Sequence, residues 1–215
     1  MNLTEQKMLD ALKKGRDQYG VVAIKAEFEA EGTRPDEFLR LLELGQRADL
    51  KVALKIGGCE AVSDLFSTKI YGIDYVIAPM VETPYALSKF IDAKNKTHGP
   101  DEQRTEFLFN LETQTTLDNL DAMLKEVKGV GAILIGEGDL GQELGIPRQY
   151  EHPELLKQMG RVVETCKKHN VIVGHPHVEA GNCERIISEG YRFLMCAPVR
   201  SYNHLDKARA AAGLK

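Results

Sequence analysis

The chain has 215 residues, of which 43% are hydrophobic and 28% are charged, and its formal net charge is −4. This size suits one sizeable core, so we expect residues 1–215 to form a single domain. The weak acidity disfavours nucleic acid as a partner, because phosphate binding needs clustered Lys and Arg, and no apolar run reaches the roughly 18–20 residues that span a bilayer.

The opening residues and the cysteines both indicate a cytoplasmic protein. The first segment, MNLTEQKMLDALKKGRDQYG, carries too many charges for a secretory signal. The four cysteines are scattered without a CxxC pair, so the spacing indicates neither a metal site nor a disulfide framework. Free thiols in a reducing compartment are the simplest interpretation, with each Cys a small buried residue.

Apolar runs alternate with helical patterns along the chain, and the opening segment around Leu9 is itself an amphipathic helical pattern. The runs predicted as strands are VVAIKAEF (21–28), KVALKIG (51–57), DYVIAPM (74–80), EFLFNLE (106–112), GAILIGE (131–137), NVIVGH (170–175) and RFLMCAP (192–198). Most are continuously apolar, which is typical of parallel strands covered on both faces. The helices between and after them are predicted to begin near Pro35, Glu60, Pro84, Thr116, Pro153, Ala180 and Leu205.

Strand followed by helix, repeated seven times, predicts an α/β fold with a parallel sheet. Seven units in this length favour a closed, compact (β/α)8 TIM-barrel-like architecture, with one strand missing or merged because only seven are found. The most polar stretch, NKTHGPDEQR (95–104), is predicted to be a plain surface loop before the fourth strand, with a mobile lid as the alternative.

Two carboxylates stand at the ends of neighbouring apolar runs, Glu112 after FLFNL and Asp139 after AILIGEG. The carboxyl ends of parallel strands meet at the mouth of such a fold, where ligands bind. Two carboxylates there, beside a Gly-rich turn, suit a hard divalent cation whose other ligands are water and substrate oxygens. The alternative for each residue is a helix N-cap or a solvated loop position.

Two lysines, Lys25 and Lys55, interrupt predicted strands. Each is open to three interpretations: an ion pair with an acid such as Glu27 or Glu112, a contact with a substrate carboxylate, or a Schiff base if its pKa is depressed.

Two arginines and two histidines complete the candidates at the strand ends. Arg34 and Arg200 are either clamps for a substrate carboxylate or members of surface salt bridges. His175 and His177, on either side of Pro176, share one face of an extended chain, so both could reach a metal or substrate; the alternative is an ordinary loop position.

Several of these segments resemble one known family. IDYVIAPMVETPYAL (73–87) resembles the "PMVET" strand of the HpcH/HpaI aldolase/citrate lyase family, and FLFNLET (107–113) resembles its "IET" strand. AILIGEGDLGQELG (132–145) resembles its "IGPADLS…LG" turn, and HPEL (152–155) its "HPE" helix start. The motifs occur in the family's order and near its spacing, most clearly from Lys55 to Leu155.

The resemblance implies a (β/α)8 barrel that cleaves or forms a C–C bond next to the carbonyl of a small oxo acid, through a pyruvate-like enolate. It implies a divalent metal, Mg²⁺ or Mn²⁺ with Co²⁺ possible, bound by Glu112 and Asp139. It places the family's substrate-binding Arg at Lys55, and substrate-binding backbone amides at Gly136, Glu137 and Gly138. It also implies a homo-oligomer, a hexamer or trimer.

The sequence departs from the family where an Asp–His catalytic pair is expected, because the matching segment reads IKAEFEAEG (24–32). Lys25, Glu27, Glu29 or His175 could replace that base, and the sequence selects none of them. Three hypotheses follow: a metal-dependent C–C lyase, a Schiff-base aldolase that uses Lys25 or Lys55, and a non-catalytic oxo-acid-binding barrel.

Overall fold

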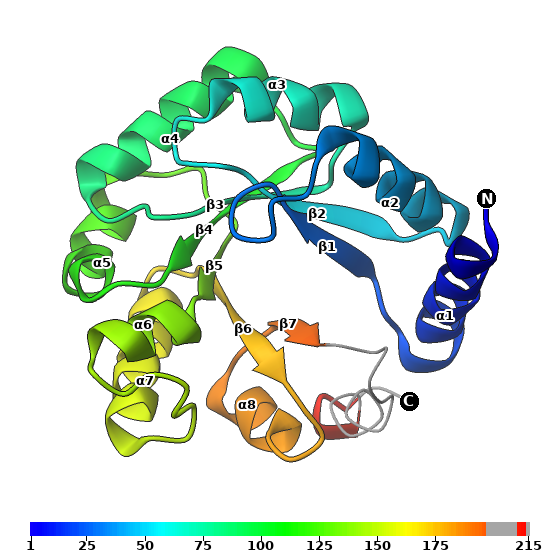
Figure 1. Cartoon of the computed structure of the whole chain (residues 1–215). Helices are drawn as coiled ribbons and strands as arrows, with labels where there is room; N and C mark the ends of the chain where they lie inside the picture. The colour runs from blue at the N-terminus through cyan, green and yellow to red at the C-terminus, as the bar shows by residue number, and fades with distance from the viewer. Residues whose placement is uncertain (197–209, 214–215) are drawn as a thin grey trace.

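The computed structural model describes residues 1–196 and 210–213, and within them strands and helices alternate along the chain (Figure 1). The strands are β1 (Ala23–Glu27), β2 (Lys51–Lys55), β3 (Tyr75–Ala78), β4 (Glu106–Leu111), β5 (Ala132–Ile135), β6 (Ile172–Val178) and β7 (Phe193–Cys196). The helices are α1 (Leu3–Tyr19), α2 (Pro35–Arg47), α3 (Val62–Tyr71), α4 (Pro84–Thr97), α5 (Gln114–Glu126), α6 (Glu137–Glu143), α7 (Pro153–Lys168) and α8 (Cys183–Glu189). All seven predicted strands are present, whereas the helix predicted near Leu205 lies outside the described residues.

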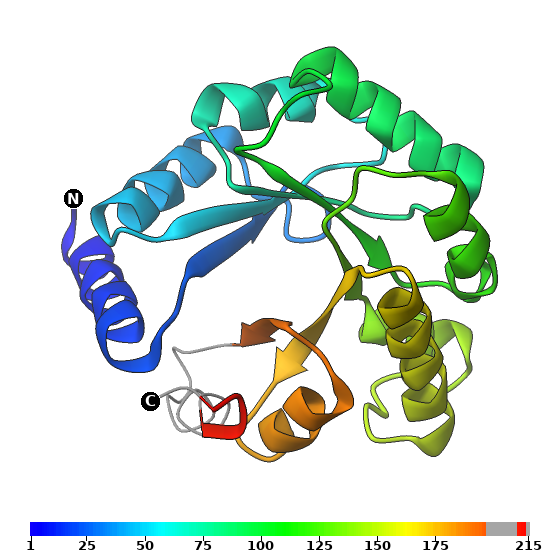
Figure 2. The ribbon, with the colours of Figure 1, turned by 180° about the vertical axis from the view of Figure 1, so that it is seen from behind.

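The strands form one parallel sheet in the order β1-β2-β3-β4-β5-β6-β7, so each strand pairs with its neighbours in sequence. The sheet curls, and the helices lie on its outer side in an arc (Figures 1 and 2). The fold is therefore TIM-barrel-like, as predicted. Closure differs from the prediction: in the described part of the chain, β1 and β7 are the two ends of a curled but open sheet.

The two faces of the sheet carry different residues because side chains alternate along a strand. Residues such as Val52, Leu54 and Val76 point outward and pack against the helices in the main hydrophobic core. The inner face is lined by a smaller apolar cluster of Ala53, Ile77, Leu108, Ala132 and Leu134. The sheet therefore has an outer face covered by helices and an inner face with a small apolar cluster. The polar residues of the inner face lie closer to the carboxyl ends of the strands.

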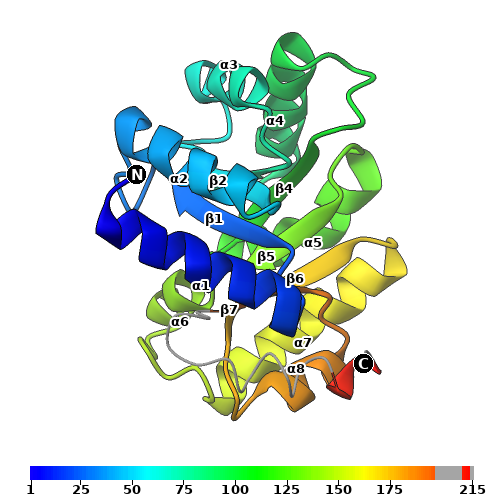
Figure 3. The same ribbon diagram turned by 90° about the vertical axis from the view of Figure 1, so that its right-hand side faces the viewer.

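The N-terminal helix α1 packs beside α2 at the edge of the sheet (Figure 3). Leu9 of α1 joins Leu44, Ala48 and Leu50 in a small separate cluster of buried residues. A capping box between Asn2 and Glu5 satisfies backbone N–H groups that the first turn leaves without helical partners. In the described residues, no helix combines the length and apolarity that crossing a membrane requires.

Helix α6 was not predicted, because GEGDLG was interpreted as part of a strand followed by a turn. The strand β5 ends at Ile135, Gly136 is the N-cap residue, and Glu137 begins the helix. Its seven residues are too few to show a helical periodicity in the sequence. This difference moves Asp139 from a loop into the first turn of a helix.

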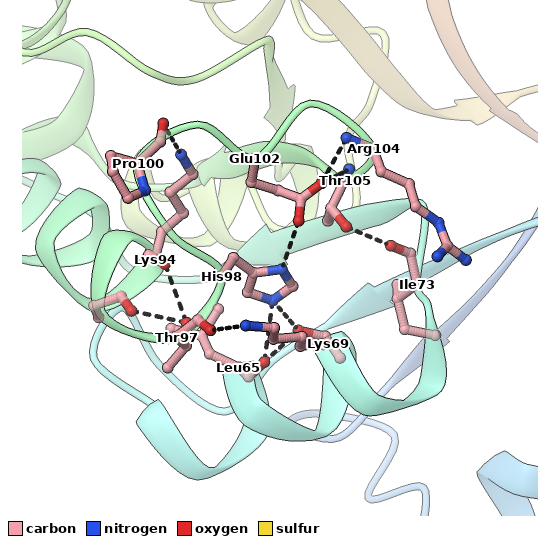
Figure 4. Close-up of polar contacts among 12 residues, drawn as sticks. Leu65, Lys69, Ile73, Lys94, Thr97, His98, Pro100, Glu102, Arg104 and Thr105 are labelled. Carbon is pink, nitrogen blue, oxygen red and sulfur yellow. Dashed lines mark hydrogen bonds and ion pairs between the residues drawn. The ribbon is translucent and has the colours of Figure 1, made fainter.

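Residues 95–97 of the polar stretch form the end of α4, and the rest connects α4 to β4 at the amino ends of the strands, opposite the mouth, which rules out a lid over the carboxyl ends. His98 caps the end of α4, and its side chain is buried between α3 and the loop (Figure 4). The ring Nε2 lies 3.1 Å from the Leu65 carbonyl and 3.0 Å from Thr68 Oγ1. Since a carbonyl can only accept, Nε2 carries the proton in this neutral histidine.

Burial lowers the pKa of His98, and the nearby Lys69 and Lys94 ammonium groups act in the same direction. His98 Nδ1 has no hydrogen-bond partner and lies 3.8 Å from Glu102 Oε2. Burial also lowers the pKa of His175, which packs edge-to-face on Tyr191. The folded protein therefore holds two histidines neutral that would bind protons readily when unfolded.

We expect the free energy of unfolding to decrease as the pH falls below about 6.5, the ordinary histidine pKa. Because the pKa of His98 is lowered in the folded protein, the unfolded chain binds more protons. The contribution of His98 to the free energy of unfolding is therefore complete above about pH 6.5, and it is lost as the pH falls through the lower pKa of the folded protein. Urea unfolding of wild type and His98→Gln from pH 8 to pH 5 tests this. In the Gln variant the free energy of unfolding should depend less on pH than in wild type. An equal pH dependence in both proteins would contradict the assignment to His98.

Candidate functional site

The charged residues predicted at the strand ends gather at the carboxyl end of the inner face. The parallel register places Glu27 opposite Lys55, and Lys25 opposite Ala53, which belongs to the inner apolar cluster. Lys25, Glu27 and Lys55 therefore share the inner face, because residues two apart on a strand point the same way. A layer of charges thus lies above the apolar layer of the barrel interior.

Lys55 is buried and lies between two carboxylates. Its Nζ is 2.8 Å from Glu29 Oε2 and 3.8 Å from Glu112 Oε2. The hydrogen bond from Lys55 lowers the pKa of Glu29. The predicted pairing of Lys55 with Glu112 is thus present, and Glu29 from the loop after β1 is an additional partner.

Lys25 donates a hydrogen bond to Glu27 on the same strand, which is the other predicted ion pair. Burial lowers the pKa of Lys25 to about 8, and the positive charge of Lys55 contributes to the shift. An amine with this pKa is mostly protonated near physiological pH, but its neutral fraction is far larger than that of an ordinary lysine, and a neutral amine can accept a proton or attack a carbonyl. Lys25 is therefore the chemically most reactive group of this interior.

Glu112 immediately follows β4, and its carboxylate is buried and held from two sides. Its Oε1 accepts from the Met80 backbone N–H at 2.9 Å, and its Oε2 accepts from the Asn110 side chain at 3.0 Å. Met80 adopts a positive φ of 52°, which costs free energy for a residue other than Gly and is uncommon. This backbone conformation directs the Met80 N–H at the carboxylate.

Gly136 lies directly against Glu112. A Cβ added at Gly136 would be 2.5 Å from Glu112 Cβ and 3.0 Å from its Oε2, so a larger residue cannot fit without displacement. Asp139 follows one turn later on the same side of α6, because residues three apart in a helix share a face. Asp139 is exposed, as a ligand that shares a cation with solvent and substrate needs to be.

These residues fit a hard divalent cation. Glu112 supplies carboxylate oxygens beside the Gly136 contact, and Asp139 supplies a second carboxylate from the adjoining helix. Among the described residues, no group of three or more His, Cys, Asp or Glu side chains could hold a metal ion, so a cation bound by Glu112 and Asp139 would need water and substrate oxygens to complete its coordination. That open arrangement is typical of catalytic rather than structural cation sites.

The three backbone amides predicted to bind substrate differ in their present roles. The Gly136 N–H donates to the Leu111 carbonyl at 2.7 Å, so the sheet already uses this amide. The Glu137 and Gly138 amides lie in the first turn of α6, where N–H groups have no intrahelical acceptor. The importance of Gly136 is thus its close approach to Glu112, while a role in substrate binding stays a prediction for the other two.

Two predicted candidates lie away from this interior. Gly174 points inward, since a Cβ there would meet Leu134 and Phe193, so the neighbouring His175 points outward and is buried against Tyr191. This position disagrees with a catalytic role for His175. Arg34 forms exposed ion pairs with Asp36 and Glu37, which is the surface alternative. Arg200 lies outside the described residues.

Comparison with known proteins agrees with the motifs. A family model described as HpcH/HpaI aldolase/citrate lyase matches residues 58–197. The chain belongs to the HpcH/HpaI aldolase/citrate lyase family. The matched range contains Glu112, Gly136 and Asp139, and begins three residues after Lys55.

Sequence relatives of this family member are aldolases that it matches over short segments. A 2-keto-3-deoxy-L-rhamnonate aldolase of Klebsiella pneumoniae is 30% identical over 87 residues, which are 40% of this chain and 32% of that protein. The Salmonella paratyphi B enzyme of the same name is 41% identical over 59 residues, 27% of this chain and 20% of that protein. The chain thus matches about a third or less of the length of these curated relatives.

Solved structures, two of which are named as HpcH/HpaI proteins, share this fold. A family protein from Burkholderia cenocepacia J2315 superposes with a TM-score of 0.77 at 17% identity, covering 99% of this chain and 91% of that one. An HpcH/HpaI aldolase from Desulfitobacterium hafniense DCB-2 superposes with a TM-score of 0.77 at 15% identity, covering 100% of this chain and 92% of that one. The citrate synthase SbnG superposes with a TM-score of 0.71 at 16% identity, covering 95% of this chain and 88% of that one. These likenesses concern the fold.

Sequence reasoning missed Met80 and the hydrogen bond between Glu137 and His177. The positive φ of Met80 has no local signal, because Gly, Asn or Asp is the usual residue there. Glu137 and His177 are 40 residues apart, and their contact depends on how α6 meets the end of β6. The pairing of β5 with β6 brought them within reach, and the sequence signal was only a histidine after a predicted strand.

We expect Gly136→Ala to destabilise the fold by about 1–3 kcal/mol, the usual cost of overpacking. The added Cβ would overlap Glu112 Cβ, so Glu112 or the start of α6 must move. Gly138→Ala is the matched control, because a Cβ at Gly138 has no atom within 4 Å. Urea unfolding of both variants measures the difference; equal stability of the two would show that the close approach is unimportant.

Proposed function

We propose that this chain is a divalent-metal-dependent lyase that cleaves or forms a C–C bond adjacent to the carbonyl of a small 2-oxo acid. Family membership and the aldolase names of its relatives support the reaction class. The observation that carries the proposal is the buried Glu112 carboxylate packed against Gly136, one helical turn from Asp139. A cation bound there would act as a Lewis acid toward the keto oxygen of the substrate.

Lys55 is suited to binding the carboxylate of the oxo acid. Its ammonium is buried beside the proposed cation site, 3.8 Å from Glu112 Oε2. A lysine binds a carboxylate as a point charge, without the paired hydrogen bonds that an arginine forms. Lys55 would therefore set where the acid group lies and leave its orientation to the other contacts of the site.

Lys25 is the best candidate for the general base. Of the replacements that the sequence left open, His175 points out of the barrel, Glu29 pairs with Lys55, and Glu27 accepts from Lys25 itself. In the cleavage direction, the neutral Lys25 amine would take the proton of the hydroxyl group next to the breaking C–C bond. In the synthetic direction, the resulting ammonium would return that proton to the new hydroxyl oxygen.

A second candidate function follows from the same lysine. A buried amine whose pKa is about 8 and whose neighbour is another lysine has the properties of a Schiff-base nucleophile. Lys55, held by Glu29 and Glu112, is less suited to attack a carbonyl. Borohydride reduction in the presence of pyruvate, followed by peptide mass spectrometry, separates the functions: an adduct on Lys25 supports the Schiff base, and its absence supports the metal route.

Exchange of the methyl protons of pyruvate with D₂O, followed by NMR, tests the metal-dependent function without knowledge of the second substrate. We expect exchange to stop in metal-stripped protein and to return with Mg²⁺, Mn²⁺ or Co²⁺. In the double variant Glu112→Gln with Asp139→Asn the exchange rate should fall by about a hundredfold or more, because amide oxygens lack the negative charge with which two carboxylates hold a divalent cation. Full exchange in that variant would refute the proposal, and wild type without exchange or turnover would indicate a non-catalytic oxo-acid-binding barrel.

The rate of C–C bond cleavage should rise with pH through about 8, because Lys25 must lose its proton to accept that of the substrate hydroxyl, and burial lowers its pKa to about that value. Lys25→Arg should remove this rise and lower kcat/KM by about 10²–10⁴, since Arg stays protonated. Lys51→Met, at the exposed amino end of β2, is the control and should keep the wild-type profile. A wild-type pH profile in Lys25→Arg would exclude Lys25 as the base.

A further inference from the structure

Helix α6, like α3 and α8, begins without a proline and without a side-chain cap. Helices α2, α4 and α7 begin with Pro35, Pro84 and Pro153, whose rings fix φ at a helical value. Helix α6 begins with Glu137 instead, and its N-cap residue Gly136 has no side chain that could cap it. A short helix of this kind needs another contact to define its direction and its rotation.

Glu137 supplies such a contact. Its side chain is only 2% exposed, and its Oε1 accepts a hydrogen bond from His177 Nδ1 at 2.5 Å. Its Oε2 lies 3.6 Å from Nε2 of the buried His175. A hydrogen bond to a carboxylate is among the stronger ones in proteins, and burial increases its importance. The first residue of α6 is thereby attached to the end of β6.

His177 is itself held in place, so it can serve as an anchor. Its ring stacks on Tyr150, with centroids 5.2 Å apart and planes 29° apart. Its backbone carbonyl accepts from Asn182 Nδ2 at 3.0 Å, at the beginning of α8. The Glu137–His177 pair therefore joins α6 to β6, to the segment before α7 and to α8.

The pair also sets which way Asp139 points. Successive residues in an α-helix turn by about 100°, so Glu137 and Asp139 lie on opposite sides of α6. The structure agrees, since Glu137 is buried on the helix-covered side of the sheet while Asp139 is exposed. Burying Glu137 against His177 therefore fixes the rotation of α6 and leaves the opposite side of the helix, which carries Asp139, exposed.

We propose that His177, acting through Glu137, is a positioning residue for the cation site formed by Glu112 and Asp139. The inference rests on the proposed function, because it assumes that these two carboxylates bind the metal. Loss of the His177 donor leaves a buried carboxylate without its hydrogen bond, and such a group is costly unless it moves into water. Movement of Glu137 rotates α6 and takes Asp139 away from Glu112. Outer contacts of this kind typically change metal affinity by about 10–100-fold.

The test compares Mn²⁺ affinity, measured by electron paramagnetic resonance of free Mn²⁺, with amide hydrogen exchange across residues 136–143 of metal-free protein. The informative variants are His177→Leu, which removes the donor, and His177→Asn, whose side-chain amide nitrogen falls near the position of Nδ1 and can donate to Glu137. His169→Leu is the matched control, because it removes a different histidine–carboxylate contact, with Asp121, between α7 and α5. Because the His177 side chain is 56% exposed, its substitution does not open a core cavity.

We expect His177→Leu to weaken Mn²⁺ binding at least tenfold and to speed exchange across residues 136–143. His177→Asn should recover most of both properties, and His169→Leu should match wild type in both. Unchanged Mn²⁺ affinity in His177→Leu, or no recovery in His177→Asn, would overturn the positioning role while leaving the cation site intact. Failure of the proposed function looks different: wild type and Glu112→Gln would then bind Mn²⁺ equally weakly, which overturns both inferences.

Discussion

The close contact between Gly136 and Glu112 is the constraint on which the candidate site depends. It brings the end of β5 against the first residue after β4, at a distance that only glycine allows. The Glu112 side chain is then fixed by the Met80 N–H and by Asn110, and the helix that starts after Gly136 carries Asp139. A larger residue at position 136 would displace Glu112 or the start of α6.

The inner face of the sheet also explains why so many charges are buried in one place. Its lower layer is apolar and small, while its upper layer holds Lys25, Glu27, Lys55 and Glu112. Buried ion pairs seldom add net stability, because removing charges from water offsets their attraction. Their concentration at the carboxyl ends of the strands is therefore not explained by a gain in folding stability, which agrees with the function proposed for this site. The depressed pKa of Lys25 is a direct result of this burial.

Buried histidines occur at both ends of the same sheet, with different consequences. His98 lies at the amino end, where it binds the end of α3 to the loop before β4, and it contributes to stability (Figure 4). His175 lies beside Glu137 near the carboxyl end, within the group of residues that holds α6. The two histidines differ in their roles because they lie at opposite ends of the sheet, and residue type alone does not show this difference.

The sequence by itself determined the seven described strands, their order and every described helix except α6. Continuous apolar runs located all seven described strands, and the prolines at positions 35, 84 and 153 marked three helix starts, because these signals operate within a few residues. The Lys25–Glu27 pair was equally accessible, since both residues lie on one strand. The motifs around Glu112 and Asp139 identified the family for the same reason.

Only the tertiary structure decided how these elements combine into a site. The outward direction of His175 depends on the packing of Gly174 against Leu134 and Phe193, and the open sheet depends on which strands pair. The contact of Glu137 with His177 joins residues 40 positions apart through the rotation of α6. Strand register and helix rotation are set by close packing of the whole barrel, and no local stretch of sequence contains that information.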